Sequence, residues 1–179
     1  YTLSPTYSVC ANDGYLADVN DSFYVRHRYM DPKIPILTRV EVKNARKGIN
    51  KALLNRMNIV YDLYFHNDRL ADYPNIVEYG RQIEKLRRRY SDRIWNTTFD
   101  AHNGMCVNGR NIEYSIFINK DGKRTAVVCN MDHESATRVS VSREGIGELE
   151  YATPEIPESQ PFRDGTELAP LSAVIIMEQ

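Results

Sequence analysis

A predicted helix over residues 72–90 is followed at once by a region whose pattern is that of β-strands alone. Apolar residues recur along the helix at three- and four-residue steps, Pro74 suits its first turn, and basic residues gather at its end. The preceding residues 58–65 form a nearly continuous apolar and aromatic run, typical of a parallel strand covered on both faces. This order predicts an α+β protein: terminal β/α units of a barrel followed by an antiparallel β-sandwich.

Three shorter elements are predicted before that strand. Prolines keep the apolar runs at residues 23–25 and 34–38 short, so each predicts a brief strand. Residues 43–56 follow a helical period in which Ile49, Ala52 and Leu53 share one face. Basic and amide side chains occupy the other faces. The pattern therefore predicts an outer helix that packs on the sheet through one stripe and is otherwise solvated.

The region beyond Trp95 alternates apolar and polar residues in short segments. Residues 112–118 alternate at period two, a turn signal follows at residues 121–122, and residues 125–129 supply a partner strand. Such strands recur about every ten residues with no helical segment between them, which predicts an antiparallel sandwich.

The expected core of that sandwich follows from the period-two alternation. It consists of Ile112, Tyr114, Ile116, Val127, Val139, Val141, Val174 and Ile176. We place residues 1–92 in the barrel units and residues 93–179 in the sandwich domain, because the change of pattern falls between them.

The length of the chain limits how much of a barrel it contains. The sequence has 179 residues, whereas a complete barrel of eight β/α units needs at least about 200. Residues 1–92 are therefore expected not to close a barrel. An open parallel sheet leaves an unpaired edge, so we expect the remaining barrel, or a second copy of the chain, to cover it. The chain starts at Tyr1 without a Met, which suggests a processed or truncated product and leaves localisation unknown.

Charge and hydropathy give no reason to expect nucleic acid or a membrane as a partner. The net charge is −1, so no long-range attraction to polyanions follows. Residues 85–89 are basic, but Leu86 interrupts them on the buried face of the helix and no aromatic platform accompanies them. No stretch approaches the roughly 18 apolar residues of a membrane helix.

The sequence also contains no pattern that requires a metal or a cofactor. Its three cysteines have no metal-binding spacing, and Cys129 lies in an apolar run, typical of a small buried hydrophobe. There is no glycine-rich phosphate loop and no serine nucleophile elbow.

The candidate substrate-binding residues surround the end of the strand at residues 58–65. Active sites of barrels are built from the loops that follow the strands, and sugar sites combine carboxylates, amides and aromatic rings. The candidates are Asp62, Tyr64, His66, Asn67, Asp68 and Arg69. In the alternative interpretation, Asp68 and Arg69 pair with each other or cap the next helix.

Two further groups of residues could bear on function. Residues 26–29, Arg-His-Arg-Tyr, could bind a carboxylate or form a short exposed cationic turn. Glycoside hydrolysis needs two positioned carboxylates, and Glu41, Asp62 and Asp68 are the acidic residues near predicted strand ends. No spacing marks any of them as catalytic.

The order of segments resembles a known type of enzyme. The residues that carry the resemblance are 58–65, 70–74, 78–81, 86–90 and Trp95, with 119–122, 127–130 and 170–174 in the β region. Over residues 23–179 the chain resembles the C-terminal part of a glycoside-hydrolase-like (β/α)-barrel family with an appended β-sandwich. The resembling motifs are structural, so no catalytic residue is carried over.

The resemblance implies the C-terminal portion of a glycoside hydrolase, contributing scaffold and substrate rim, with a carbohydrate as the partner of the whole protein. We expect no turnover from this chain alone. One alternative is a carbohydrate-binding β-sandwich module with exposed aromatic residues on a sheet face. The candidates for that role are Trp95, Phe99, Tyr114, Phe117, Tyr151 and Phe162. The other alternative is a structural interaction fragment.

Overall fold

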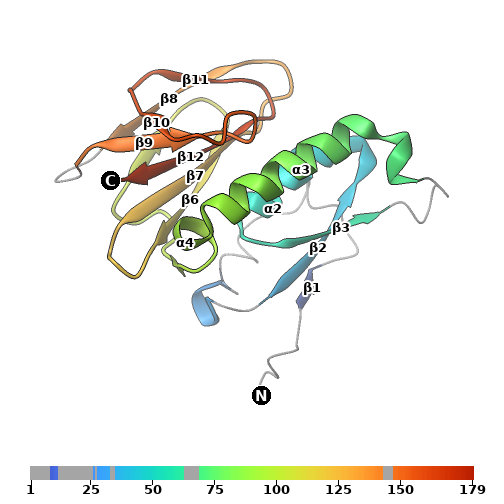
Figure 1. Cartoon of the computed structure of the whole chain (residues 1–179), viewed down its shortest axis with the longest axis horizontal. Helices are drawn as coiled ribbons and strands as arrows, with labels where there is room; N and C mark the ends of the chain where they lie inside the picture. Colours follow the sequence, from blue (N-terminus) through green and yellow to red (C-terminus); the bar gives the residue numbers. More distant parts are fainter. Residues whose placement is uncertain (1–8, 12–25, 27, 33–34, 63–68, 143–146) are drawn as a thin grey trace.

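Helices in this protein lie between a parallel sheet and a set of antiparallel sheets. The computed structural model describes residues 9–11, 26, 28–32, 35–62, 69–142 and 147–179. A parallel sheet packs on one side of the helices, and two antiparallel sheets follow on the other side (Figure 1). The chain is thus mixed α+β with mostly antiparallel strands, which confirms the predicted class in outline.

The parallel sheet has three strands in the described part of the chain. These are β1 (Val9–Ala11), β2 (Ile36–Glu41) and β3 (Asn58–Asp62), in the order β1-β2-β3. The parallel pairing expected for β3 is confirmed, with Val40 opposite Tyr61.

One face of this sheet is open to solvent. Val40 points at the helices, because a Cβ added to Gly48 would lie 3.2 Å from its methyl carbon. On the opposite face Arg39 is exposed and Val60 is 42% exposed. The prediction that both faces of β3 are covered is therefore wrong for the described part of the chain, because α2 and α3 lie on one face and Val60 on the other face is exposed (Figure 1).

The helix α2 (Ala45–Leu54), preceded by the 3₁₀ turn η2 (Val42–Asn44), is confirmed as an element but not as an outer helix. It lies between the parallel sheet and the strands β6 and β7, and eight of its ten residues are buried. Lys51 is among them, at 5% exposure, with its ammonium 3.7 Å from Glu113. The sequence pattern predicted a solvated outer face because Lys51 and Asn50 are polar. Both are buried against distant partners, Glu113 and Tyr79 respectively.

The predicted helix before the β region is confirmed as α3 (Pro74–Arg89). A 3₁₀ turn, η4 (Leu70–Asp72), precedes it and a short helix, α4 (Ser91–Ile94), follows it. Its buried residues are Tyr79, Ile83 and Leu86. Gly80 is needed where α3 meets β3, because a Cβ there would collide with the Tyr61 hydroxyl.

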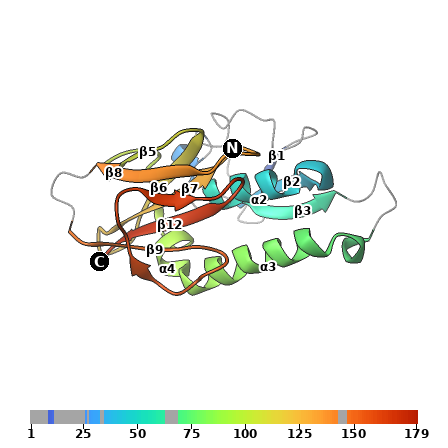
Figure 2. The same cartoon turned by 90° about the horizontal axis from the view of Figure 1, so that it is seen from above.

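The remaining strands form two antiparallel sheets (Figure 2). The larger sheet, in the order β10-β9-β12-β7-β6-β4, consists of β4 (Thr98–Phe99), β6 (Ile112–Ile118), β7 (Arg124–Asn130), β9 (Leu149–Ala152), β10 (Gln160–Pro161) and β12 (Ala173–Glu178). The smaller sheet, in the order β11-β8-β5, consists of β5 (Cys106–Asn108), β8 (Thr137–Ser142) and β11 (Thr166–Leu168).

Two hydrophobic cores result, because both faces of the larger sheet are covered. Ile116, Val174 and Ile176 face the smaller sheet and meet Val139 and Val141 there, as predicted, with Ile112 and Tyr114 packed at the margin. Val127 instead faces the helices, so its assignment to the sandwich core is wrong. Its neighbours Ala126 and Val128 take that place. When a strand is covered on both sides, as β7 is, polarity does not distinguish its two faces.

The helix-facing core draws residues from both sides of the proposed domain boundary. It joins Val40 and Leu53 to Phe117 and Ile175. The division into residues 1–92 and 93–179 stays a prediction. Within the described residues, no helix has the length and apolar character needed to span a membrane.

Candidate functional site

The carboxyl ends of the parallel strands bring together two of the acidic residues considered above. Glu41 ends β2 and Asp62 ends β3, and the two are register partners. Neighbouring strands lie about 4.8 Å apart, so the two residues stand side by side at this edge. Tyr64, His66, Asn67 and Asp68 lie outside the described residues.

Arg69 takes part in the turn that precedes α3. Its side chain is exposed, and its backbone N–H donates a 2.9 Å hydrogen bond to the Asp72 carboxylate. The Asp72 N–H donates in return to the Arg69 carbonyl at 2.9 Å. This reciprocal pair fixes the entry into the helix, as a capping box does. For Arg69, the described contacts are those of the capping interpretation.

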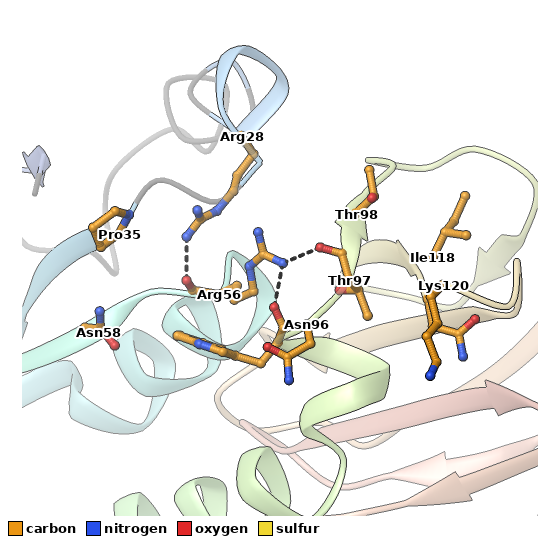
Figure 3. A pocket seen from close by; sticks show the side chains of 11 residues that line it. Arg28, Pro35, Arg56, Asn58, Asn96, Thr97, Thr98, Ile118 and Lys120 are labelled. Atoms are coloured by element: carbon orange, nitrogen blue, oxygen red, sulfur yellow. Dashed lines mark hydrogen bonds between the residues drawn. The ribbon is translucent and has the colours of Figure 1, made fainter. Parts of the chain in front are cut away.

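The opposite end of the parallel sheet borders a cavity of about 660 Å³ (Figure 3). Its wall includes Pro35 and Asn58 at the starts of β2 and β3, residues 95–98 from the end of α4 to the start of β4, and residues 118–120 at the β6–β7 hairpin. Arg28 and Arg56 complete it. None of these described lining residues is acidic, so they supply no carboxylate pair for glycoside hydrolysis.

Two buried arginines fix the geometry of the cavity. Arg28 donates from Nε to the Asn55 carbonyl at 3.2 Å and from Nη2 to the Arg56 carbonyl. Arg56 donates from Nη1 to the carbonyls of Trp95 at 3.0 Å and Thr97 at 2.8 Å. Arg56 thus connects the end of α2 to the segment after α4 (Figure 3).

Burial weakens the hold of both guanidinium groups on their protons. It is the main cause that lowers the pKa of Arg28 to about 10, with the adjacent Arg56 charge second and Asp31 opposing. Burial also lowers the pKa of Arg56. Both side chains stay cationic at neutral pH, so the cavity wall carries a positive charge.

Residues 26–29, predicted either to bind a carboxylate or to form an exposed cationic turn, differ in their exposure. Arg26 and Tyr29 are exposed, and His27 lies outside the described residues. Arg28 is only 2% exposed, so an exposed cationic turn is the wrong interpretation for it. The rest of the cavity was not found from the sequence, because its residues come from distant segments with no shared spacing. The arginine-rich run at 26–29 was the one local signal.

A buried polar network joins α2, α3 and the larger sheet, away from both ends of the parallel sheet. The Tyr79 hydroxyl donates to Asn50 Oδ1, and the Cys129 thiol donates to the Asn50 carbonyl at 3.6 Å. Arg46 covers the Tyr79 ring at 3.9 Å and pairs with Glu155 at 3.0 Å. Burial raises the pKa of Tyr79 far above its usual range. Cys129 is buried as expected, and the network serves packing.

The described residues contain no cluster of His, Cys, Asp and Glu side chains suited to hold a metal ion. No family model and no curated protein matches the sequence. Among solved structures, the chain is similar to a Paenibacillus polymyxa xyloglucanase from glycoside hydrolase family 44, in a structure of the enzyme and in one with xyloglucan. Both comparisons give a TM-score of 0.41 at 16% identity and cover 99% of this chain.

The chain spans 39% of the length of those xyloglucanase chains. The similarity is distant, and a TM-score of 0.41 is too low to assign residue roles. It specifies no function for this chain.

Proposed function

We propose that this chain is the C-terminal portion of a glycoside hydrolase and contributes scaffold and substrate rim. The observation that carries the proposal is the one-sided parallel sheet, with helices on one face and Arg39 and Val60 exposed on the other. In a (β/α) barrel the helices form the outer ring, and the other face of each strand points into the barrel. The open face would then be part of the interior of an incomplete barrel.

The substrate rim in this proposal lies at the carboxyl ends of the strands. Barrel enzymes build their active sites there, from the loops that follow the strands. Asp62 and the residues after it, Tyr64, His66, Asn67, Asp68 and Arg69, supply the residue types that bind sugar hydroxyls and ring faces. Glu41 adds a second acidic residue beside Asp62.

The alternative, a sugar-binding sheet face, is less well supported by the aromatic residues themselves. Phe99 and Phe117 are buried at 3% and 0% exposure in the helix-facing core. Tyr151 and Phe162 pack edge to face, with ring centroids 6.3 Å apart, against the core between the sheets. Phe99 and Phe117 therefore offer no face on which a sugar could stack, and Tyr151 and Phe162 are partly buried.

The remaining barrel is the proposed covering of the open sheet. In the order β1-β2-β3, strand β3 is at an edge. A groove of about 540 Å³ runs beside it, lined by Ile59, Tyr61, Ile83 and Trp95 among others. Among the described strands the outer edge of β3 is unpaired, and an edge next to such a groove fits a further strand from the rest of the barrel, or from a second copy of the chain.

Hydrolysis assays on plant and bacterial polysaccharides test this function. We expect the product of the complete coding sequence to release reducing sugar and the isolated chain of residues 1–179 to release none. Hydrolysis needs two carboxylates held by a closed scaffold. Turnover by the isolated chain would contradict the proposal. So would the absence of hydrolysis by the longer, correctly folded product on every polysaccharide of the panel.

A further inference from the structure

The cavity at the amino ends of β2 and β3 has a strong excess of positive charge. Arg28, Arg56 and Lys120 line it, and none of the described lining residues is acidic. Two of these cations are nearly inaccessible, with Arg28 2% and Arg56 5% exposed. Arg56 lies close to the Arg28 charge, which Asp31 partly offsets, so an anion that enters the cavity beside Arg56 and Lys120 would gain favourable electrostatic contacts.

Arg56 retains hydrogen-bonding capacity toward the cavity. Its bonds to Trp95 and Thr97 both use Nη1. A guanidinium group has five N–H donors, and Nε and Nη2 of Arg56 make no hydrogen bond in the part of the chain that the structure describes. Neither atom is among the fully buried, unpaired ones. Although the Arg56 side chain as a whole is almost buried, each of these two nitrogens keeps a small exposed surface from which it can donate to an oxyanion.

The other polar side chains of the cavity suit a sugar ring. Asn58, Trp95 and Asn96 line the wall, and their side chains make no hydrogen bond within the described ranges. Amide groups both donate and accept, as sugar hydroxyls require. Arg87 lies 4.0 Å from the centre of the Trp95 ring and covers one face of it, which holds the indole in place.

We infer that this cavity binds an anionic saccharide, in which a carboxylate meets Arg56 and Lys120 and ring hydroxyls meet Asn58 and Asn96. The volume of about 660 Å³ accommodates a ligand of one to a few sugar units. The site uses none of the residues at the carboxyl ends of the strands. The inference therefore goes beyond the proposed hydrolase function, and the two can be tested independently.

Isothermal titration calorimetry on the 179-residue chain tests this inference with three probes. Trigalacturonate carries both the carboxylates and the rings, neutral galactotriose carries only the rings, and acetate carries only a carboxylate. We expect trigalacturonate to bind at least about tenfold more tightly than either of the others, because a charge-assisted hydrogen bond contributes enough for that ratio. Its affinity should fall as salt is added.

Lys120→Ala is the informative variant, because Lys120 is exposed and its loss does not disturb the core. We expect it to weaken trigalacturonate binding about tenfold. Lys85→Ala removes the same charge from an exposed position on α3 outside the cavity and should leave the affinity unchanged. Asn58→Ala should weaken trigalacturonate and not acetate.

Four results would overturn the inference: no binding of trigalacturonate, equal affinity for galactotriose, equal affinity for acetate, or equal effects of the two lysine variants. Thermal melting of each variant, which we expect to match the parent, separates loss of binding from loss of fold.

Discussion

Asp132 organises the turn between β7 and β8 through three hydrogen bonds. Its Oδ1 accepts from the backbone N–H groups of Glu134 at 2.9 Å and Ser135 at 3.0 Å, and its Oδ2 accepts from Asn111 at 2.7 Å. These bonds, the one from Glu134 first, lower the pKa of Asp132 to about 2. A carboxylate that is easier to ionise in the folded state stabilises the fold above its unfolded pKa.

Asp132→Asn tests this contribution through its pH dependence. The parent should be more stable than the variant at pH 6, and the difference should shrink between about pH 4 and pH 2, as the carboxylate is protonated. Thermal melting at a series of pH values measures it. Asp92→Asn, at an exposed position of α4, is the control. A difference between the parent and the Asp132 variant that stays constant across this range would show that the carboxylate bonds do not stabilise the turn.

Gly80→Ala should destabilise the protein by about 1–3 kcal/mol, the usual cost of overpacking. Alanine is the better helix former by up to about 1 kcal/mol, but the added methyl group would collide with the Tyr61 hydroxyl. Urea unfolding measures the effect. In a Tyr61→Phe background the clash is absent, so the same substitution should be neutral or stabilising. An equal cost in both backgrounds would locate the strain elsewhere.

Among the elements, β12 is central to the larger sheet, where it pairs with both β7 and β9. Val174 on this strand is 2% exposed and faces the smaller sheet. Val174→Asp should lower the free energy of unfolding by on the order of 3–5 kcal/mol, since it buries an unpaired charge. Ile156→Asp is the control at 51% exposure and should change the stability by less than about 0.5 kcal/mol. Similar urea midpoints for the two variants would contradict the register of β12.

The sequence predicted these elements better than their surroundings. The helices at α2 and α3, the parallel strand β3 and the hairpin of β6 and β7 all follow from local period and turn residues. The burial of α2 and the orientation of Val127 do not, because each depends on a layer contributed by a distant part of the chain. Local polarity records how often a residue meets water, and not which of two buried faces it occupies.

The two candidate sites differ in the same way. The loop after Asp62 was proposed from the strand-to-helix order alone, and it stays a prediction, because residues 63–68 lie outside the described residues. The cavity was not, because Arg28, Arg56, Trp95 and Lys120 meet only through the packing of four separate segments.

At the scale of the whole molecule, the open parallel sheet predicts association. We expect the isolated chain to self-associate in a concentration-dependent way, because the edge of β3 is unpaired among the described strands. Light scattering after size-exclusion chromatography measures the mass over a dilution series. Val60→Lys should shift the chain toward monomer, since lysine on an edge strand opposes pairing. Met30→Lys, at 82% exposure, is the control. A parent that stays monomeric at every concentration would show that this surface needs no covering.

The kinetics of Asp68→Asn, measured in the product of the complete coding sequence, test most directly whether this chain supplies substrate rim and not the catalytic carboxylates. We predict that KM rises more than kcat falls, because a rim residue binds the ground state and the transition state about equally. Asp92→Asn is the surface control. A loss of about a thousandfold in kcat with KM unchanged would make Asp68 a catalytic carboxylate and would contradict the account.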